Sequence, residues 1–465
     1  MNTRMKALIA ALVVTLPALF FAVKKLRSKK RSKAANRTVP SSLIWEIQYE
    51  RTKIMKAHRL GSFLLAFLLL SLFLVSATGC SGMTVQAHDL MEDIIPENKE
   101  GLEIDKSFLQ SFSDFSVKLF KEAREEGQNA LISPFSVMMA LAMTANGAGG
   151  QTLTQMEELF GCDLASLNRY LLSCCERLKG DQLKIADSIW FRNTLPVKKS
   201  FLQVNADFYK AAAYASPFDE TTLSDINYWV EKNTDGMIEK LLDELDTDAQ
   251  MILINALAFD AKWKTKYESD AISKQYFTAL NGEKTKVSFQ KSTESLYIST
   301  EQATGFLKPY DGEKFSFLAL LPNEGVDFEE YLSSLTGESL LSAIRSAQPL
   351  MVEANIPQFE TEYSSELSAP LKNLGMMDAF GNSADFSGIS EADKLFISQV
   401  LHKTAFSLDD QGTKAAAVTG VFLNMEMAPV QIPPDRIVTL DRPFVYAIVD
   451  TQTGLPLFLG TLTDI

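Results

Sequence analysis

Few residues in this chain could move a proton near neutral pH. It has three histidines, His58, His88 and His402, and only His402 lies in the long C-terminal part. A Ser-His-Asp triad would therefore have to use His402 as its base. The stretch ISQVLHKTAFSLDD around it alternates apolar and polar residues, as a strand does. We interpret His402 as a buried, hydrogen-bonded structural residue, with a hydrolase built on it as the alternative.

The cysteines and the known catalytic motifs give no indication of an active site either. The cysteines Cys80, Cys162, Cys174 and Cys175 form no CxxC pair and have no metal-ligand spacing, and adjacent Cys174 and Cys175 are typical of two thiols on a helix. No GxSxG, HExxH or P-loop motif occurs. The GAGG run at 147–150 follows no strand and indicates a turn. The sequence predicts neither an enzyme, nor a metal site, nor a cofactor.

The charge is divided unevenly along the chain. Of the formal net charge of −13, the first 60 residues contribute +12, from 14 Lys and Arg against Glu46 and Glu50, so the remainder carries −25. Nucleic-acid binding needs a basic face, and this acidic body argues against it and against a heparin-type cofactor. The 46% hydrophobic content is that of a globular protein with a sizeable core.

An apolar run, Phe63 to Val75, follows Lys56 and Arg59 and ends in Ser-Ala-Thr-Gly-Cys at Cys80. Basic end, apolar middle, small residues and a cysteine are typical of a bacterial lipoprotein signal. We expect a signal peptide at 55–80, lipid on Cys80, a short tether at 81–103, and an extracellular protein anchored to the membrane at the cell surface.

Met55 stands directly before this signal. We hypothesise that translation starts there, and that residues 1–54 are an over-extended reading frame. The alternative is that the earlier apolar run, 7–23, is a first transmembrane segment.

The remainder, 104–465, has no repeat and no linker composition, which predicts one α+β domain. Phe108 to Leu119 has helical spacing of apolar residues, and Ser136 to Thr144 predicts a buried helix. Further along, three patterns predict strands: MILINALAF (251–259), FSFLALL (315–321), and the hairpin formed by 444–450 and 455–462.

The segment 409–429 fits two structures at once. Read with period two, small and then apolar residues fall on one face, as in a strand buried between neighbours: Thr413, Ala415, Ala417, Thr419, Val421 and Leu423. Acids before it and prolines after it are typical of an exposed loop.

Long collinear stretches resemble the serpin family across 104–465. Among them are NALISPFSVMMALAMTANGAGGQTLTQM (129–156), ILINALAFDAKW (252–263), ISQVLHKTAFSLDDQGTKAAAVT (397–419) and DRPFVYAIVDTQTGLPLFLGTL (441–462). The resemblance implies three β-sheets, about nine α-helices and an exposed reactive loop near the C-terminus. It further implies a monomer that traps a target serine protease as a covalent acyl-enzyme when the loop inserts into the central sheet. A non-inhibitory binding or chaperone protein at the cell surface is the alternative.

The resemblance also assigns roles to individual residues. A loop hinge comprises Asp410, Gly412, Thr413, Ala415, Ala416, Ala417 and Thr419. A buried cluster where the sheet opens comprises Ser133, Ser136, Asn255 and His402, and Trp263 lies at the point of loop entry. The family often pairs the hinge acid with a Lys at the start of the IPQF-type strand, but here the acid is Asp410 and the strand position is Gln358. A charge pair is therefore lost, and we hypothesise easier spontaneous insertion.

In the family that the chain resembles, the reactive bond lies about sixteen residues after the hinge acid, which implies Glu426-Met427 here. Met427-Ala428 and Met425-Glu426 remain open as alternatives. A Glu-specific protease would suit the first bond, and elastase-, chymotrypsin- or subtilisin-like proteases would suit a Met.

Overall fold

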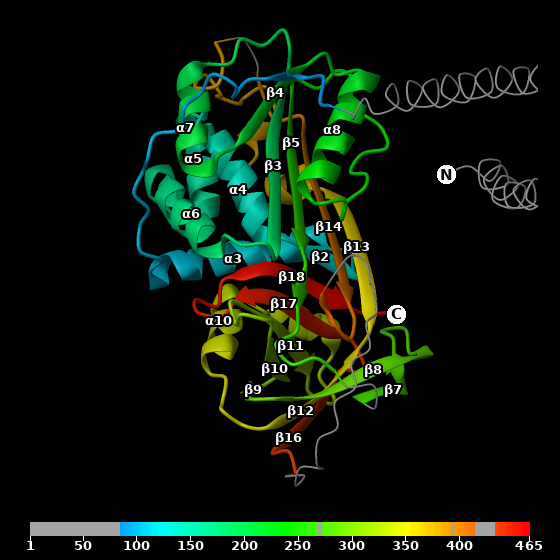
Figure 1. Cartoon of the computed structure of the whole chain (residues 1–465). Helices are drawn as coiled ribbons and strands as arrows, with labels where there is room; N and C mark the ends of the chain where they lie inside the picture. Colours follow the sequence, from blue (N-terminus) through cyan, green and yellow to red (C-terminus); the bar gives the residue numbers. More distant parts are fainter. Residues whose placement is uncertain (1–83, 268–270, 392–394, 414–432) are drawn as a thin grey trace, which may run out of the picture. The chain divides into compact units, whose positions relative to one another are not determined.

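The structure is a computed structural model that describes residues 84–267, 271–391, 395–413 and 433–465 (Figure 1). The described residues form three β-sheets and nine α-helices, so the expected α+β architecture is confirmed.

The long sheet contains eight strands, and its order is β1-β4-β3-β5-β14-β15-β6, with β13 also paired to β14. The strands are β1 (His88–Asp89), β3 (Leu183–Arg192), β4 (Ala212–Ser216), β5 (Met251–Phe259), β6 (Ala261–Lys262), β13 (Phe359–Glu366), β14 (Gln399–Leu408) and β15 (Gly412–Thr413).

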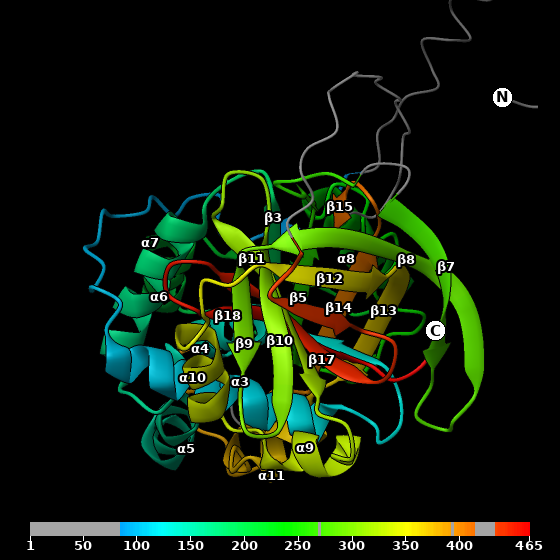
Figure 2. The ribbon, with the colours of Figure 1, turned by 90° about the horizontal axis from the view of Figure 1, so that it is seen from below.

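The other two sheets lie below the long sheet in Figure 1, and Figure 2 shows β12 and β8 of the smaller one beside β10 and β11 of the larger. The six-stranded sheet consists of β2 (Ala130–Ile132), β18 (Pro456–Leu462), β17 (Phe444–Asp450), β11 (Phe315–Pro322), β10 (Ala303–Pro309) and β9 (Leu296–Ser299). The four-stranded sheet consists of β16 (Arg436–Thr439), β12 (Val352–Pro357), β8 (Lys284–Glu294) and β7 (Ile272–Thr278).

The helices of the described residues are α3 (Lys106–Ala123), α4 (Pro134–Ala145), α5 (Gly150–Phe160), α6 (Leu164–Leu178), α7 (Lys199–Tyr209), α8 (Glu220–Asn233), α9 (Phe328–Ser334), α10 (Gly337–Arg345) and α11 (Ser368–Asn373), with a 3₁₀ turn, η2 (Asp378–Phe380). The helix predicted over Ser136 to Thr144 is α4, and all of its residues are buried. None of the helices in the described part of the chain is long and apolar enough to cross a bilayer.

The predicted strand MILINALAF is β5, and every one of its residues is buried. Its side chains alternate between two cores. Leu253 and Leu257 join the large core that also contains α4, whereas Ile252 and Ile254 join a smaller core with Trp229 of α8. Burial on both faces is why the strand is apolar throughout instead of alternating.

Residues 84–103, expected to be a tether, lie along the domain instead. The strand β1 pairs antiparallel with β4 at the edge of the long sheet. The backbone N–H groups of Gln86 and Ala87 both donate to the Asp225 carboxylate of α8, at 2.7–3.0 Å. The segment is held because its backbone finds acceptors far away in the sequence.

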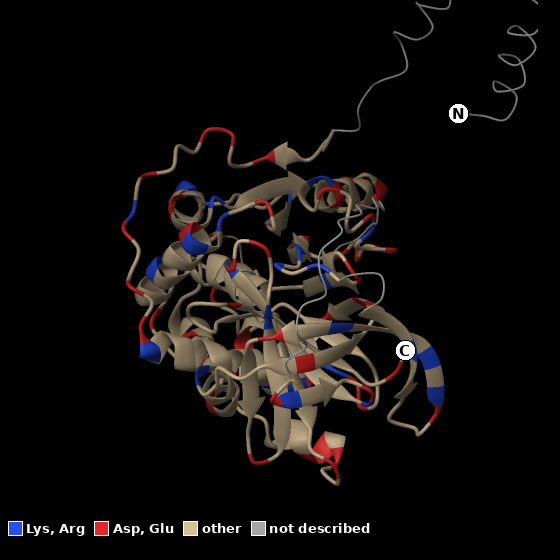
Figure 3. Ribbon diagram, turned by 60° about the horizontal axis from the view of Figure 1, so that its bottom comes forward, with Lys and Arg blue, Asp and Glu red and all other residues tan. Residues whose placement is uncertain are grey.

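The described basic residues are not gathered on one face of the domain. Figure 3 shows Lys and Arg scattered among Asp and Glu over the visible ribbon, without a continuous basic stripe. Cys162, Cys174 and Cys175 are free thiols, and the latter two lie on α6 as predicted.

Candidate functional site

The central boundary of the long sheet lies between β5 and β14. These strands run parallel and pair directly over seven residue pairs, from Gln399 opposite Ile252 to Ala405 opposite Ala258. No other described strand lies between them over this range. Beyond Ala405, β14 pairs with β15 instead, through Leu408 and Thr413.

The hinge begins with a tight turn after β14 and returns as β15. Thr413 pairs with Leu408 of β14 on one side and with Ala261 of β6 on the other. It is fully buried, and its Oγ1 lies 2.7 Å from the Tyr310 hydroxyl. Thr413 therefore already occupies the first position of a strand between β14 and the continuation of β5.

Gly412 has no room for a side chain, because the backbone of Ala261 lies close to it. A Cβ at this position would lie 2.1 Å from the carbonyl oxygen of Ala261, closer than any real side chain comes. A larger residue would push the hinge out of the sheet, so the close approach of the Ala261 carbonyl requires glycine here.

Trp263 binds the backbone of the turn. Its indole Nε1 donates to the Asp409 carbonyl at 3.0 Å, and its backbone N–H donates to the Gln411 carbonyl at 2.9 Å. The indole is stacked on the Tyr310 ring, with centroids 4.5 Å apart. Trp263 and Tyr310 together contact alternate residues of the segment 409–413, the turn and short strand at the start of the hinge.

The predicted cluster of Ser133, Ser136, Asn255 and His402 is brought together at the middle of the boundary. Ser133 N–H donates to His402 Nε2 at 3.1 Å, and Ser136 Oγ donates to Asn255 Oδ1 at 2.8 Å. His402 Nδ1 is hydrogen-bonded to the same Asn255 oxygen. Since His402 opposes Asn255 in the register, this bond joins β14 to β5.

These contacts define the charge state of His402. Nε2 accepts from a backbone N–H, so Nδ1 carries the proton and the ring is neutral. Burial lowers the pKa of His402 to about 3. A neutral ring whose two nitrogens are both engaged is a structural hydrogen-bonding group, in line with the sequence interpretation.

Asp187 completes the cluster, and sequence reasoning missed it. Its Oδ1 accepts from Asn255 Nδ2 at 2.7 Å, and it opposes Asn255 in the β3–β5 register. Burial raises the pKa of Asp187 well above its usual range, and the bond from Asn255 acts in the opposite direction. The available signal was one acid within the mostly apolar run IADSIWF (185–191).

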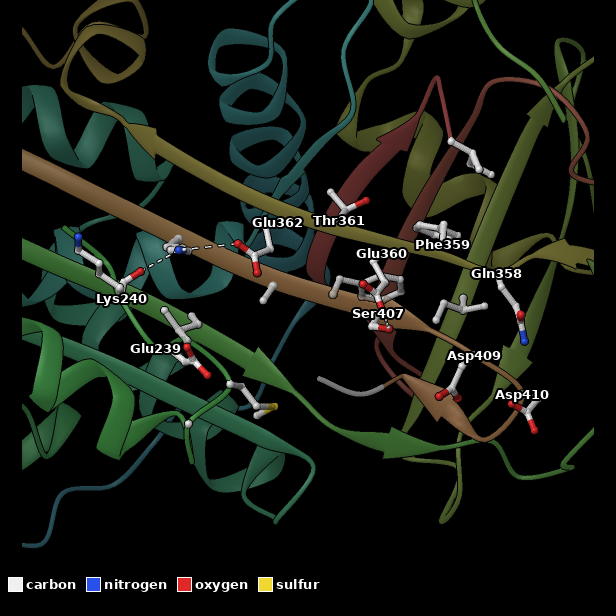
Figure 4. A pocket seen from close by; sticks show the side chains of 18 residues that line it. Glu239, Lys240, Gln358, Phe359, Glu360, Thr361, Glu362, Ser407, Asp409 and Asp410 are labelled. Carbon is white, nitrogen blue, oxygen red and sulfur yellow. Dashed lines mark hydrogen bonds and ion pairs between the residues drawn. The ribbon is translucent and has the colours of Figure 1, made fainter. Parts of the chain in front are cut away.

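Asp410 and Gln358 line the same groove of about 1150 Å³, between the turn after α8 and strands β13 and β14. Figure 4 shows both at one end of it, with Asp409. Asp410 Oδ2 accepts from the Gln411 amide at 2.8 Å, and no ion pair of Asp410 occurs among the described residues.

The remaining predicted site residues lie outside the described residues: Ala415, Ala416, Ala417, Thr419, Met425, Glu426, Met427, Ala428 and Cys80. Described structure resumes at residue 433, just before β16.

The family model that matches residues 110–465 is that of serpin (serine protease inhibitor). The chain belongs to the serpin family. Serpins are in general inhibitors of serine proteases rather than enzymes.

Individual relatives agree with this assignment. An uncharacterized serpin-like protein of Thermococcus kodakarensis is 31% identical over 79% of this chain and 87% of its own length. The leukocyte elastase inhibitor of Bos taurus is also 31% identical, over 75% of this chain and 97% of its own. The crystal structure of the thermophilic serpin tengpin in its native state is 43% identical, with a TM-score of 0.77, and covers 82% of this chain and 100% of tengpin.

Proposed function

We propose that this serpin is a suicide substrate that traps serine proteases by inserting residues 414 onward between β5 and β14. The observation that carries the proposal is the position of Thr413, which is paired between β14 and β6 while β5 and β14 remain directly bonded below it. Thr413 thus lies where the first residue of an inserted strand would lie, and β5 and β14 are still paired beyond it.

Insertion is favourable because it adds a strand. Each hydrogen bond broken between β5 and β14 is replaced by bonds from the new strand to both neighbours. The residues that would face the core next, Ala415 and Ala417, are small, so they enter without the overpacking that costs about 1–3 kcal/mol per site. The free energy released by insertion is available to distort a protease carried on the loop.

The covalent step uses the protease's own chemistry. Its serine oxygen attacks the carbonyl carbon of the reactive bond, the C–N bond breaks, and the new amine leaves with a proton from the protease histidine. Insertion then displaces the acyl-enzyme and disorganises its oxyanion hole, so water does not release it. We propose Glu426-Met427 as the reactive bond, with Met427-Ala428 and Met425-Glu426 as alternatives.

The experiment mixes the purified protein with elastase, chymotrypsin, subtilisin and a Glu-specific endopeptidase, followed by denaturing gels and mass spectrometry. The expected result is a band that resists denaturant at about the summed masses. The first residue of the released C-terminal peptide, Met427, Ala428 or Glu426, identifies the bond.

A matched pair of hinge variants tests the mechanism. Thr413→Arg places a charge at a fully buried position, so the loop should be cleaved without complex formation. Thr413→Ser keeps the hydroxyl that contacts Tyr310 and should still form complex. Cleavage of the unmodified protein by every protease, with no complex, would refute trapping and favour the non-inhibitory binding role.

We propose further that the protein is anchored outside the cytoplasm through lipid on Cys80. The support is the signal-like sequence at 55–80. Labelling with an alkyne fatty acid in a bacterial host should mark the full chain and not Cys80→Ser. An epitope tag placed before Met55 should be undetectable if translation begins there, and its recovery at full length would refute that start.

A further inference from the structure

A buried ion pair lies directly behind the loop-entry tryptophan. Lys308 of β10 and Glu294 at the end of β8 are 1% and 6% exposed, and Lys308 Nζ lies 2.8 Å from Glu294 Oε1. The same carboxylate oxygen accepts from Ser292 Oγ at 2.6 Å. Neither residue belongs to the cluster at the middle of the sheet.

The Lys308 ammonium also contacts two aromatic rings. Nζ lies 4.9 Å from the centroid of the Trp263 ring and 4.5 Å from that of Tyr267. Both distances are within the range of cation–π attraction, which is strongest for tryptophan and for desolvated cations. Burial lowers the pKa of Lys308, and Glu294 acts in the opposite direction.

Stability alone does not explain this pair. Burying two charges incurs a desolvation penalty that their attraction barely offsets, and apolar residues of similar volume are often as stable. We therefore assign the pair a role in orienting the indole. The Glu294 carboxylate fixes the position of the Lys308 ammonium, and the ammonium attracts the face of the Trp263 indole.

The contacts continue from the indole to the hinge. Trp263 donates to the carbonyls of Asp409 and Gln411, and its stacking partner Tyr310 binds the Thr413 hydroxyl. Three of the five residues from 409 to 413 are therefore fixed by these two side chains and their backbone. Rotation of the indole would break the bond to Asp409 and remove the ring against which Tyr310 packs.

We propose that Glu294 and Lys308 are positioning residues that hold Trp263 against the hinge and keep Thr413 inside the long sheet, ready for insertion. The consequence for inhibition rests on the proposed function. If the hinge leaves the sheet, insertion starts later, and more acyl-enzyme is hydrolysed before it is trapped.

The test replaces the pair with apolar residues in one double variant, Lys308→Met with Glu294→Leu, so that no lone buried charge remains. The matched control, Arg124→Met with Glu329→Leu, removes a partly buried ion pair that joins α3 to α9 and contacts no hinge residue. Lys308→Arg keeps a cation beside the rings and should behave as the unmodified protein.

Backbone hydrogen exchange, followed by mass spectrometry, measures the hinge without any protease. In the first double variant, exchange across 409–413 should rise about five- to tenfold, as expected for loss of one ordinary hydrogen bond. Exchange in β17 and the thermal midpoint should not change, and the control should show no rise at the hinge. Unchanged exchange at 409–413, or an equal rise everywhere, would overturn the positioning role.

The stoichiometry of inhibition then tests the consequence. More inhibitor per trapped protease should be needed by the first double variant and not by the control. Equal stoichiometry despite faster hinge exchange would overturn the link to insertion. If the unmodified protein traps no protease, the proposed function fails, and the exchange result still decides the positioning role.

Discussion

His402 should make the sheet sensitive to acid, and His402→Gln should remove that sensitivity. Glutamine retains both hydrogen bonds, because its oxygen can accept from the Ser133 N–H and its amide can donate to Asn255 Oδ1. It carries no titratable proton. The variant therefore separates the charge of the ring from its hydrogen bonds.

The magnitude follows from linkage. Burial lowers the pKa of His402 from 6.5 to about 3, so the folded state favours the neutral ring. This contribution to stability is complete above pH 6.5 and is lost as the pH falls from 6.5 towards 3. At pH 5 the loss is about 2 kcal/mol, at 1.36 kcal/mol per pH unit. Asp187, whose pKa is raised, has the opposite sign but is common to both proteins.

The assay is the thermal midpoint at fixed scan rate, measured at pH 7.5 and 5.0. A loss of about 2 kcal/mol spread over ~380 residues corresponds to a midpoint lowered by about 2–3 °C in the unmodified protein relative to His402→Gln. His88→Gln, at the exposed histidine of β1, is the control and should follow the unmodified protein. An identical acid response in His402→Gln would refute the buried neutral histidine.

Three further outcomes are expected. Gln358→Lys places a cation near Asp410 in the same groove. Their attraction, up to about 1 kcal/mol, should lengthen the half-life of the active form about fivefold on mild heating. An unchanged half-life would contradict the hypothesis of easier insertion. Gly412→Val would force a side chain to within 2.1 Å of a β6 carbonyl oxygen, so hinge exchange should increase and complex formation decrease. Asp225→Ala removes the acceptor for the Gln86 N–H, so amides of the N-terminal segment should exchange about tenfold faster while α8 stays protected.

Strands that have a clear pattern of apolar residues could be predicted from the sequence. The run MILINALAF is β5 because burial on both faces demands an apolar residue at each position. The hairpin predicted from 444–450 and 455–462 is β17 and β18. The lack of a second histidine in the body was sufficient to favour a structural role for His402.

The residues that the sequence did not reveal have roles set by strand register and by partners that are distant in the sequence. Asp187 matters only because β3 and β5 align it with Asn255. Lys308 and Glu294 come from different sheets and are fourteen positions apart. The segment 84–103 has no periodicity of its own, and what holds it is a carboxylate on α8. No local pattern encodes such contacts.

Two sets of polar contacts hold the long sheet, one at its centre and one at the end where the hinge lies. At its centre, the His402–Asn255 bond joins β14 to β5, and breaking it would leave the buried His402 Nδ1–H without an acceptor, whereas Asn255 Oδ1 would keep the bond from Ser136 Oγ. At its end, Trp263 and Tyr310 hold the hinge within the sheet. Under the proposed function, the central bond would delay opening of the long sheet, whereas the end contacts would keep the hinge where it can fill the opening.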